Sequence, residues 1–292
     1  MKTLLHAGLR TAFQVSVLMA FVSISGVATA VGQDTHLATP WITEHATSVR
    51  LIGGAVPGQG EAETVAGIEI KLDPSWKTYW RNPGSSGVPP RVEWTGSVNL
   101  AKAEVLFPAP QRFPDKEGDT IGYKTSVILP VKVSRIDPAK PVELRLALEY
   151  GVCRDVCIPA QANLALTLPA TGTKVGANDN LIAAVKQVPR PEQARLPNDP
   201  VAKSIVIELA GDKPRIRIEA DFPGQSDGQD AFLEAPDGLW LPLPKLVGRE
   251  GSIRRFEVDL TDGADISDLK GRDIRLTLVS SAGQSETVFA FK

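Results

Sequence analysis

The sequence predicts an all-β chain in which two β-sandwich domains are joined by one short helix. Gly 25 and Pro 23 among 292 residues indicate many turns and few long helices. Apolar residues recur at every second position in many short segments, which is typical of antiparallel strands with one buried face. About 260 residues follow a predicted export signal, which is more than one sandwich of about 100 residues needs.

The first thirty residues have the three parts of a secretory signal peptide. Lys2 and Arg10 supply positive charge, an apolar run extends from Val15 to Val27, and residues 28–30 match a small-x-small cleavage site. Serines interrupt the apolar run, so it is shorter than the roughly 20 residues that span a bilayer. We expect cleavage after about Ala30, a periplasmic location and no stable membrane insertion afterwards. An uncleaved membrane anchor is the alternative.

The first sandwich is expected over residues 43–170, after a flexible leader at residues 31–42 that mixes Gly, Gln, Asp, Thr and Pro without periodicity. Period-two alternation predicts strands at residues 68–72, 142–150 and 164–168. The segment Val127–Val131 is apolar on both sides and predicts a more buried strand, with Pro130 at an edge or a bulge.

A change of period after residue 177 predicts the helix. Leu181, Ile182, Val185 and Val188 fall on one helical face, and Asn178 or Asp179 is a suitable cap. We assign residues 171–200 to this helix and a Pro-rich linker. A second small sandwich is expected over residues 201–292, with strands at residues 205–207, 216–218, 256–260, 274–278 and 288–290.

Composition and histidine content exclude several classes of function. The formal net charge is −2, so no concentrated basic face for nucleic acid or anionic lipid is expected. Outside the signal only His36 and His45 are present, which leaves a serine or cysteine triad without a well-placed base. The turn at residues 83–87 lacks the lysine and helix start of a phosphate-binding loop. We expect no cofactor.

The only two cysteines, Cys153 and Cys157, are four residues apart. An exported protein with an even cysteine count normally has them paired. Four residues of strand span about 13 Å, whereas a disulfide needs Cα atoms about 4.4–6.8 Å apart, so a helical turn or a tight hairpin end is expected between them. So small a ring contributes roughly 2 kcal/mol to stability, against nearly 5 kcal/mol for a ring of about 100 residues. This favours an exchangeable disulfide over a structural staple, which remains an alternative.

Neighbouring residues bear on the reactivity of the pair. Arg154 would favour a thiolate on an adjacent sulfur and Asp155 would oppose it, so their net effect stays open. Nearby in sequence are Trp76, Tyr79, Trp80 and Trp94, which we interpret mainly as sandwich core and strand edge, with a docking surface near the cysteines as the second interpretation.

Two other functions remain open. Two thiolates suit Cu(I), so a copper-binding or copper-tolerance module is one, although Met1 and Met19 both lie in the signal and supply no further soft ligand. A non-catalytic interaction module with an inert disulfide is the other. No metal ligand set beyond the two sulfurs is predicted.

Four segments carry a resemblance to a known family: residues 73–84 (DPSWKTYWRNPG), 87–90 (GVPP), 122–123 leading to 129–131, and 150–159 (YGVCRDVCIP). Over about residues 45–170 the chain resembles the N-terminal periplasmic domain of the thiol:disulfide interchange protein DsbD, and most closely its ScsB branch. The resemblance is weaker through the helix and the second domain.

The resemblance implies an immunoglobulin-like sandwich with thiol:disulfide oxidoreductase activity of the protein-disulfide reductase type. It implies that Cys157 forms the mixed disulfide and that Cys153 resolves it. Arg154, Asp155 and Tyr150 are expected to support the pair, and Phe113, in the stretch 113–118, is the expected cap. The implied donor is a separate DsbD- or CcdA-like membrane protein, and the implied acceptors are periplasmic thioredoxin-fold or disulfide-bonded proteins.

Overall fold

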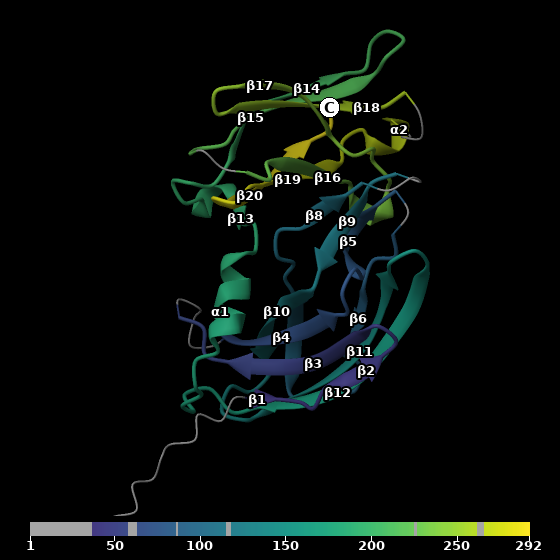
Figure 1. Cartoon of the computed structure of the whole chain (residues 1–292). Coiled ribbons are helices and arrows are strands. Elements are labelled where there is room, and N and C mark those ends of the chain that lie inside the picture. The colour runs from purple at the N-terminus through teal and green to yellow at the C-terminus, as the bar shows by residue number, and fades with distance from the viewer. Residues whose placement is uncertain (1–36, 58–62, 86, 115–117, 225–226, 262–265) are drawn as a thin grey trace, which may run out of the picture. The chain divides into compact units, whose positions relative to one another are not determined.

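The computed structural model describes residues 37–57, 63–85, 87–114, 118–224, 227–261 and 266–292, which belong to one compact unit (Figure 1). The predicted signal peptide and residues 31–36 of the predicted leader lie outside these ranges. The all-β prediction is confirmed, because four largely antiparallel sheets and few helices make up the fold. Within the described ranges, no helix combines the length and the apolar character needed to cross a membrane.

The first sandwich consists of two six-stranded sheets. One has the order β1-β3-β4-β10-β7, with β2 also paired to β3. Its strands are β1 (Leu37–Ala38), β2 (Ile42–Glu44), β3 (Thr47–Gly54), β4 (Glu63–Leu72), β7 (Leu100–Val105) and β10 (Ser126–Arg135). The other has the order β12-β11-β5-β9-β8, with β6 also paired to β11. Its strands are β5 (Lys77–Gly84), β6 (Arg91–Glu93), β8 (Gln111–Phe113), β9 (Thr120–Lys124), β11 (Val142–Cys153) and β12 (Cys157–Leu168).

The period-two segments form these strands because one of their faces lines a shared core. In β11 every second side chain from Val142 to Tyr150 is buried, and β12 continues the alternation to Leu168. They pack against the inward side chains of the opposite sheet, such as Leu51 and Ile68. Each such side chain contributes roughly 1.5–3 kcal/mol on burial. Leu37, within the predicted leader, also packs against this core, and Leu37–Ala38 pair with β3.

Pro130 lies in the interior strand β10, at neither an edge strand nor a bulge, so that part of the prediction is wrong. Its carbonyl accepts a hydrogen bond from Leu106 N, just beyond the end of β7. The proline nitrogen points to that same side, because both polar groups of a strand residue share one side. The missing N–H therefore falls past the β7 ladder, and no bond to β4 is lost.

The helix α1 (Asp179–Lys186) confirms the predicted change of period. Asn178 is its N-cap, and the Asn178 side chain accepts a hydrogen bond from Leu181 N at 3.1 Å. The helix lies beside β10 and β3 (Figure 1), where Leu181 packs with Ile52 and Val65 in a small separate core. The cap fixes where the helix begins, and the apolar face determines which side it buries.

The second sandwich consists of two four-stranded sheets with the orders β13-β20-β19-β16 and β14-β15-β18-β17. Its strands are β13 (Arg190–Pro191), β14 (Val201–Glu208), β15 (Arg215–Asp221), β16 (Asp230–Glu234), β17 (Lys245–Glu250), β18 (Ile253–Asp259), β19 (Asp273–Val279) and β20 (Gln284–Ala290). Short helices η1 (Glu192–Ala194), η2 (Pro236–Gly238) and α2 (Ile266–Leu269) connect them. The five strands predicted for this part are present, whereas β16, β17 and α2 are additional.

The strand β16 belongs to two cores at once. Ala231 and Leu233 pack inside the second sandwich, whereas Phe232 joins the core of the first together with Val279. The ring of Phe232 meets that of Trp80 on β5 at a centroid distance of 5.7 Å. The two sandwiches therefore share apolar contacts through this strand.

Candidate functional site

The two cysteines close the end of the longest hairpin in the described fold. The hairpin is formed by β11 and β12 (Figure 1). Cys153 ends β11, Cys157 begins β12, and the two are cross-strand partners joined by a disulfide. A turn at residues 154–156 reverses the chain and brings their Cα atoms to 4.2 Å. This confirms the prediction of a tight hairpin end between them.

The two sulfurs differ in their access to solvent. Cys153 is 2 % exposed, whereas Cys157 lies on the exposed tip of the hairpin. An external thiolate must reach the sulfur that it attacks. The residue open to such attack is Cys157, and Cys153 is shielded behind it.

The hydroxyl group of Tyr79 lies within hydrogen-bonding distance of both sulfurs. It is 2.6 Å from Cys153 Sγ and 3.0 Å from Cys157 Sγ. Tyr79 reaches them because β5 pairs with β11 in a register that sets Lys77 opposite Cys153. Two residues further along β5, the Tyr79 side chain lies on that same face of the sheet, since side chains alternate along a strand.

Two glycines make room for the Tyr79 ring. A Cβ atom at Gly151 would lie 3.0 Å from Tyr79 Cε2, and one at Gly87 would lie 2.6 Å from Tyr79 Cδ1. Both separations are shorter than a comfortable carbon–carbon contact of about 3.5–4.0 Å. The glycines therefore let the ring lie across the sheet with its hydroxyl at the disulfide.

Tyr79 was expected to be part of the sandwich core or a strand edge. It is indeed buried, at 3 % exposure, but its polar end faces the cysteines. Its proximity depends on the pairing of β5 with β11, which are separated by more than sixty positions. The period-two relation of Tyr79 to Lys77 and the glycine two positions before Cys153 are the local signals that were available.

Tyr150 packs in the core, on the opposite face of β11 from Cys153. Its hydroxyl donates to Thr47 Oγ1 at 3.2 Å, across the sandwich. Burial, partly offset by the hydrogen bond to Thr47, raises the pKa of Tyr150 to about 12. Tyr150 was expected to support the pair, and the structure places it in the core of the first sandwich, in the strand that carries Cys153.

Arg154 and Asp155 occupy the turn between the cysteines. The Arg154 Nε atom lies 2.9 Å from Asp155 Oδ2, and both side chains are largely exposed. The guanidinium group also lies over the ring of Trp76, 5.4 Å from its centroid. Exposed ion pairs contribute about 0–1 kcal/mol. The guanidinium group of Arg154 therefore contacts Asp155 and Trp76 within and beside the turn.

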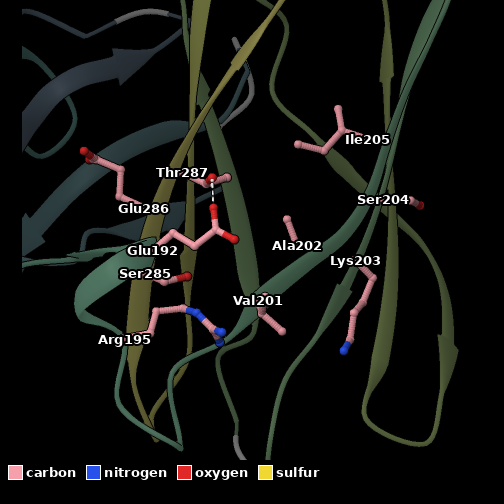
Figure 2. A pocket seen from close by; sticks show the side chains of 10 residues that line it. All are labelled: Glu192, Arg195, Val201, Ala202, Lys203, Ser204, Ile205, Ser285, Glu286 and Thr287. Atoms are coloured by element: carbon pink, nitrogen blue, oxygen red, sulfur yellow. Dashed lines mark hydrogen bonds between the residues drawn. The ribbon is translucent and has the colours of Figure 1, made fainter.

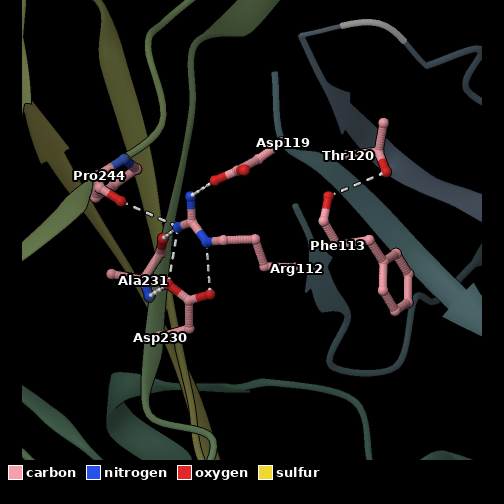
Figure 3. A network of polar contacts seen from close by, with 7 residues as sticks. All are labelled: Arg112, Phe113, Asp119, Thr120, Asp230, Ala231 and Pro244. Atoms are coloured by element: carbon pink, nitrogen blue, oxygen red, sulfur yellow. Dashed lines mark hydrogen bonds and ion pairs between the residues drawn. The ribbon is translucent and has the colours of Figure 1, made fainter. Parts of the chain in front are cut away.

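Phe113 ends β8 and is 8 % exposed. The Nζ atoms of Lys124 and Lys77 lie over its ring, 4.4 Å and 6.0 Å from the ring centroid. Lys77 Nζ also donates a hydrogen bond to Thr120 Oγ1 at 2.8 Å. Thr120 in turn donates to the Phe113 carbonyl (Figure 3). The described contacts place Phe113 next to Lys77, the cross-strand partner of Cys153. Residues 115–117 of the expected cap stretch lie outside the described residues.

Arg112, the residue before Phe113, forms hydrogen bonds from β8 to the second sandwich (Figure 3). Its guanidinium group donates to both carboxylate oxygens of Asp230 at 2.8 Å and to Asp119 at 3.0 Å. It also donates to the carbonyl oxygens of Ala231 and Pro244. Burial lowers the pKa of Arg112, but these carboxylates outweigh it and raise the pKa above its usual value.

A separate cavity of about 220 Å³ lies between η1, β14 and β20 (Figure 2). Arg195 and Lys203 line it, and Glu192 accepts a hydrogen bond from Thr287 at 2.9 Å. Its lining includes no cysteine and no residue of the first sandwich. Within the described ranges, no three His, Cys, Asp or Glu residues are grouped so that they could hold a metal ion.

Comparison with known proteins gives a matching family model and a number of solved structures with a similar fold. Residues 55–169 match the family model described as thiol:disulfide interchange protein DsbD, N-terminal, and the match contains Tyr79 and both cysteines. The crystal structure of the N-terminal periplasmic domain of ScsB from Proteus mirabilis superposes with a TM-score of 0.66 at 21 % identity. That alignment covers 87 % of this chain and 98 % of that one, so the shared fold extends into the second sandwich. No curated protein sequence matches.

Proposed function

We propose that this chain relays electrons between periplasmic proteins through Cys153 and Cys157, because residues 55–169, which hold both cysteines, match the family model of the DsbD N-terminal domain. The donor is a separate DsbD- or CcdA-like membrane reductase, and the acceptors are thioredoxin-fold or disulfide-bonded proteins. One observation carries the proposal: a disulfide with one exposed and one buried sulfur lies under the hydroxyl group of a buried tyrosine.

Reduction of the chain begins at the exposed sulfur. A donor thiolate attacks Cys157 Sγ, a donor–Cys157 disulfide forms, and the Cys153–Cys157 bond breaks with its electron pair moving to Cys153 Sγ. The donor's second thiolate then attacks the donor sulfur of the mixed disulfide. This step releases the Cys157 thiolate and leaves the donor oxidised by two electrons.

Electron delivery repeats these steps in reverse. The Cys157 thiolate attacks a disulfide of the acceptor and forms a mixed disulfide, while the acceptor's other sulfur leaves as a thiolate. Cys153 then attacks Cys157 Sγ, the intramolecular disulfide re-forms, and the acceptor leaves with two thiols. Cys157 is thus the contacting residue and Cys153 the resolving residue.

Tyr79 acts on the sulfur that carries the charge. When the disulfide opens, the buried Cys153 thiolate retains a hydrogen-bond donor at the position where the hydroxyl lies 2.6 Å away. Hydrogen bonds to charged groups are roughly twice as strong as neutral ones. A stabilised leaving thiolate departs faster, so the hydroxyl promotes opening by attack at Cys157.

Trapping of mixed disulfides tests the proposal. The variant Cys153→Ser keeps the exposed thiol and lacks the resolving one, so it is expected to accumulate mixed disulfides with periplasmic thiol proteins. Cys157→Ser is the matched control and is expected to accumulate few. Mass spectrometry of non-reduced complexes provides the readout, and capture by Cys157→Ser alone reverses the two roles.

The reduction potential of the pair separates exchange from a structural staple. Exchangeable disulfides have potentials above about −300 mV, whereas structural ones lie below it. Equilibration with a dithiol buffer of known potential, followed by alkylation of free thiols, measures the value. A potential below this threshold contradicts the relay.

A further inference from the structure

The strand β5 connects the disulfide to the second sandwich within six residues. Its first half, from Lys77 to Tyr79, pairs with the end of β11 and carries the hydroxyl that lies on the sulfurs. Its second half, from Trp80 to Asn82, bonds to strands of the second sandwich. Arg81 lies only two positions from Tyr79 in the same strand.

Arg81 is the most strongly held residue of β5. Its guanidinium group binds both carboxylate oxygens of Glu234 at 2.8 Å and Glu286 at 2.6 Å. All three side chains are largely buried, and Arg275 holds the other oxygen of Glu286 at 3.2 Å. Two parallel bonds fix the plane as well as the distance of an arginine. The side chain is therefore fixed in position and in orientation.

Electrostatics agrees with this geometry. Burial acts to lower the pKa of Arg81, but the hydrogen bonds and charges of Glu234 and Glu286 raise it above its ordinary value. The guanidinium group therefore stays charged in its buried position.

Neighbouring contacts fix the same half of β5. Asn82 Nδ2 donates to the carbonyl oxygen of Leu233 at 2.9 Å, and the ring of Trp80 meets that of Phe232. These groups contact three successive positions of β16, from Phe232 to Glu234. The second sandwich thus holds β5 by a ring contact, a backbone bond and an ion pair.

We propose that Arg81 is a positioning residue: by holding β5 against Glu234 and Glu286, the second sandwich keeps the Tyr79 hydroxyl on the two sulfurs. This inference rests on the proposed function and assigns the second sandwich a part in it. The hydroxyl lies 2.6 Å and 3.0 Å from the sulfurs, and hydrogen bonds weaken steeply with small displacements. Loosening of Arg81 is therefore expected to lower the reactivity of the disulfide without removal of any group that touches it.

A double-mutant cycle tests whether Glu234 acts through Tyr79. The rate of reduction by a small dithiol, dithiothreitol, is measured against pH for the wild type, Glu234→Gln, Tyr79→Phe and the double variant. Glu234→Gln is expected to slow reduction by at least about threefold and to raise the midpoint of the thiolate titration in the reduced protein. In the Tyr79→Phe background the same substitution is expected to have no further effect, because the group through which it acts is gone.

A matched control comes from a second arginine that binds two glutamates. Arg215 contacts Glu208 and Glu257 on strands of the second sandwich. Glu257→Gln removes one carboxylate from that group and is expected to leave the reduction rate and its pH profile unchanged. A wild-type rate for Glu234→Gln, or a full effect of this substitution in the Tyr79→Phe background, overturns the proposal.

A second variant guards against misfolding. If Glu234→Gln does not fold, Asn82→Ala removes the bond to Leu233 without altering a charge, and the same cycle is run with it. Failure of the proposed function has a different signature: the wild-type disulfide then has a structural potential and Cys153→Ser traps no partner, whatever the outcome of the cycle.

Discussion

The two sulfurs of the disulfide have different surroundings, although they are bonded to each other. Cys153 is buried beside Tyr79, and Cys157 is exposed on the turn that carries Arg154 and Asp155. In the proposed relay, attack from outside begins at Cys157, and the charge that it releases arises on Cys153 next to a hydrogen-bond donor. The proposed order of events rests on access and on leaving-group stabilisation.

Replacement of Tyr79 by Phe removes the donor and keeps the ring. We expect reduction by a small dithiol to slow by about tenfold, because a hydrogen bond to a charged group contributes at least about 1.5 kcal/mol. Stopped-flow kinetics of the wild type and the variant measure the change. Tyr150→Phe is the control, since the Tyr150 hydroxyl lies on the face of β11 opposite Cys153, where it donates a hydrogen bond to Thr47. An equal slowing by both variants contradicts a specific role for Tyr79.

Gly151→Ala tests whether the Tyr79 ring needs the space that glycine leaves. The new methyl group would lie 3.0 Å from the ring, so we expect a loss of about 1–3 kcal/mol in unfolding free energy and slower reduction of the disulfide. Urea unfolding and the dithiol assay measure the two effects. Gly248→Ala is the control, because the methyl group at this position of β17 would meet only the side chain of Arg255 on β18, at ordinary contact distances of 3.5 Å or more. Wild-type rates for Gly151→Ala would show that the ring position is unimportant.

At the scale of elements, the hairpin of β11 and β12 is held by its own ladder. Twelve consecutive pairs join Val142–Cys153 to Cys157–Leu168, and the disulfide spans only the last of them. The core face of both strands is buried along its length. The fold of this hairpin therefore depends on apolar packing and backbone bonds more than on the sulfur–sulfur link.

Reduction of the disulfide is accordingly expected to lower the unfolding free energy by no more than roughly 2 kcal/mol, the entropy of a ring of about five residues. Urea unfolding of oxidised and reduced protein, with both monitored by tryptophan fluorescence, measures the difference. The reduced protein is expected to unfold cooperatively. Loss of the native fold on reduction alone would identify the bond as a structural staple.

Most elements that the sequence predicts have a single buried face. Period-two alternation predicted β4, β11 and β12 of the first sandwich, and the spacing from Leu181 to Val188 predicted α1. Five strands of the second sandwich were predicted as well, and β10 was predicted from its apolar run, whereas β3 and β5 were not predicted. The strand β16 shows no alternation, because Phe232 and its two neighbours are all buried, in two different cores. Period-two alternation requires one solvent-exposed face, so it cannot identify a strand whose two faces are both buried.

The site was predictable to the extent that it is local. Cys153 and Cys157, with the reversal between them, follow from spacing and from disulfide geometry. Tyr79 and Arg81 depend on the register of β5 with β11 and on contacts with β16, each more than seventy positions away. Nothing within the segment from Lys77 to Gly84 specifies those partners, since many registers satisfy the same alternation.

At the scale of the whole molecule, the two sandwiches are joined by more than the linker. Phe232 and Val279 of the second sandwich lie in the core of the first, and Arg81 and Arg112 bind carboxylates of β16 and β20. Apolar burial and half-buried ion pairs thus act across the same boundary. Elements that share a core tend to unfold together, because exposure of one uncovers the other.

We therefore expect a single unfolding transition for the described part of the chain. Phe222→Ala tests this, since Phe222 is fully buried inside the second sandwich, where it packs on Phe256. The loss is expected to be about 3–5 kcal/mol. In a Trp240→Phe background the remaining tryptophans all lie in the first sandwich, and all but Trp80, whose ring contacts Phe232, report its unfolding away from that contact.

If the sandwiches unfold as one, Phe222→Ala lowers the urea midpoint reported by those tryptophans by the full amount. Calorimetry of the same variant is expected to give one peak, with equal calorimetric and van't Hoff enthalpies. An unchanged tryptophan midpoint, or a second peak at lower temperature, would mean that the first sandwich is stable without the second. The ion pairs of Arg81 with Glu234 and Glu286 would then be local contacts that the first sandwich does not need for its stability.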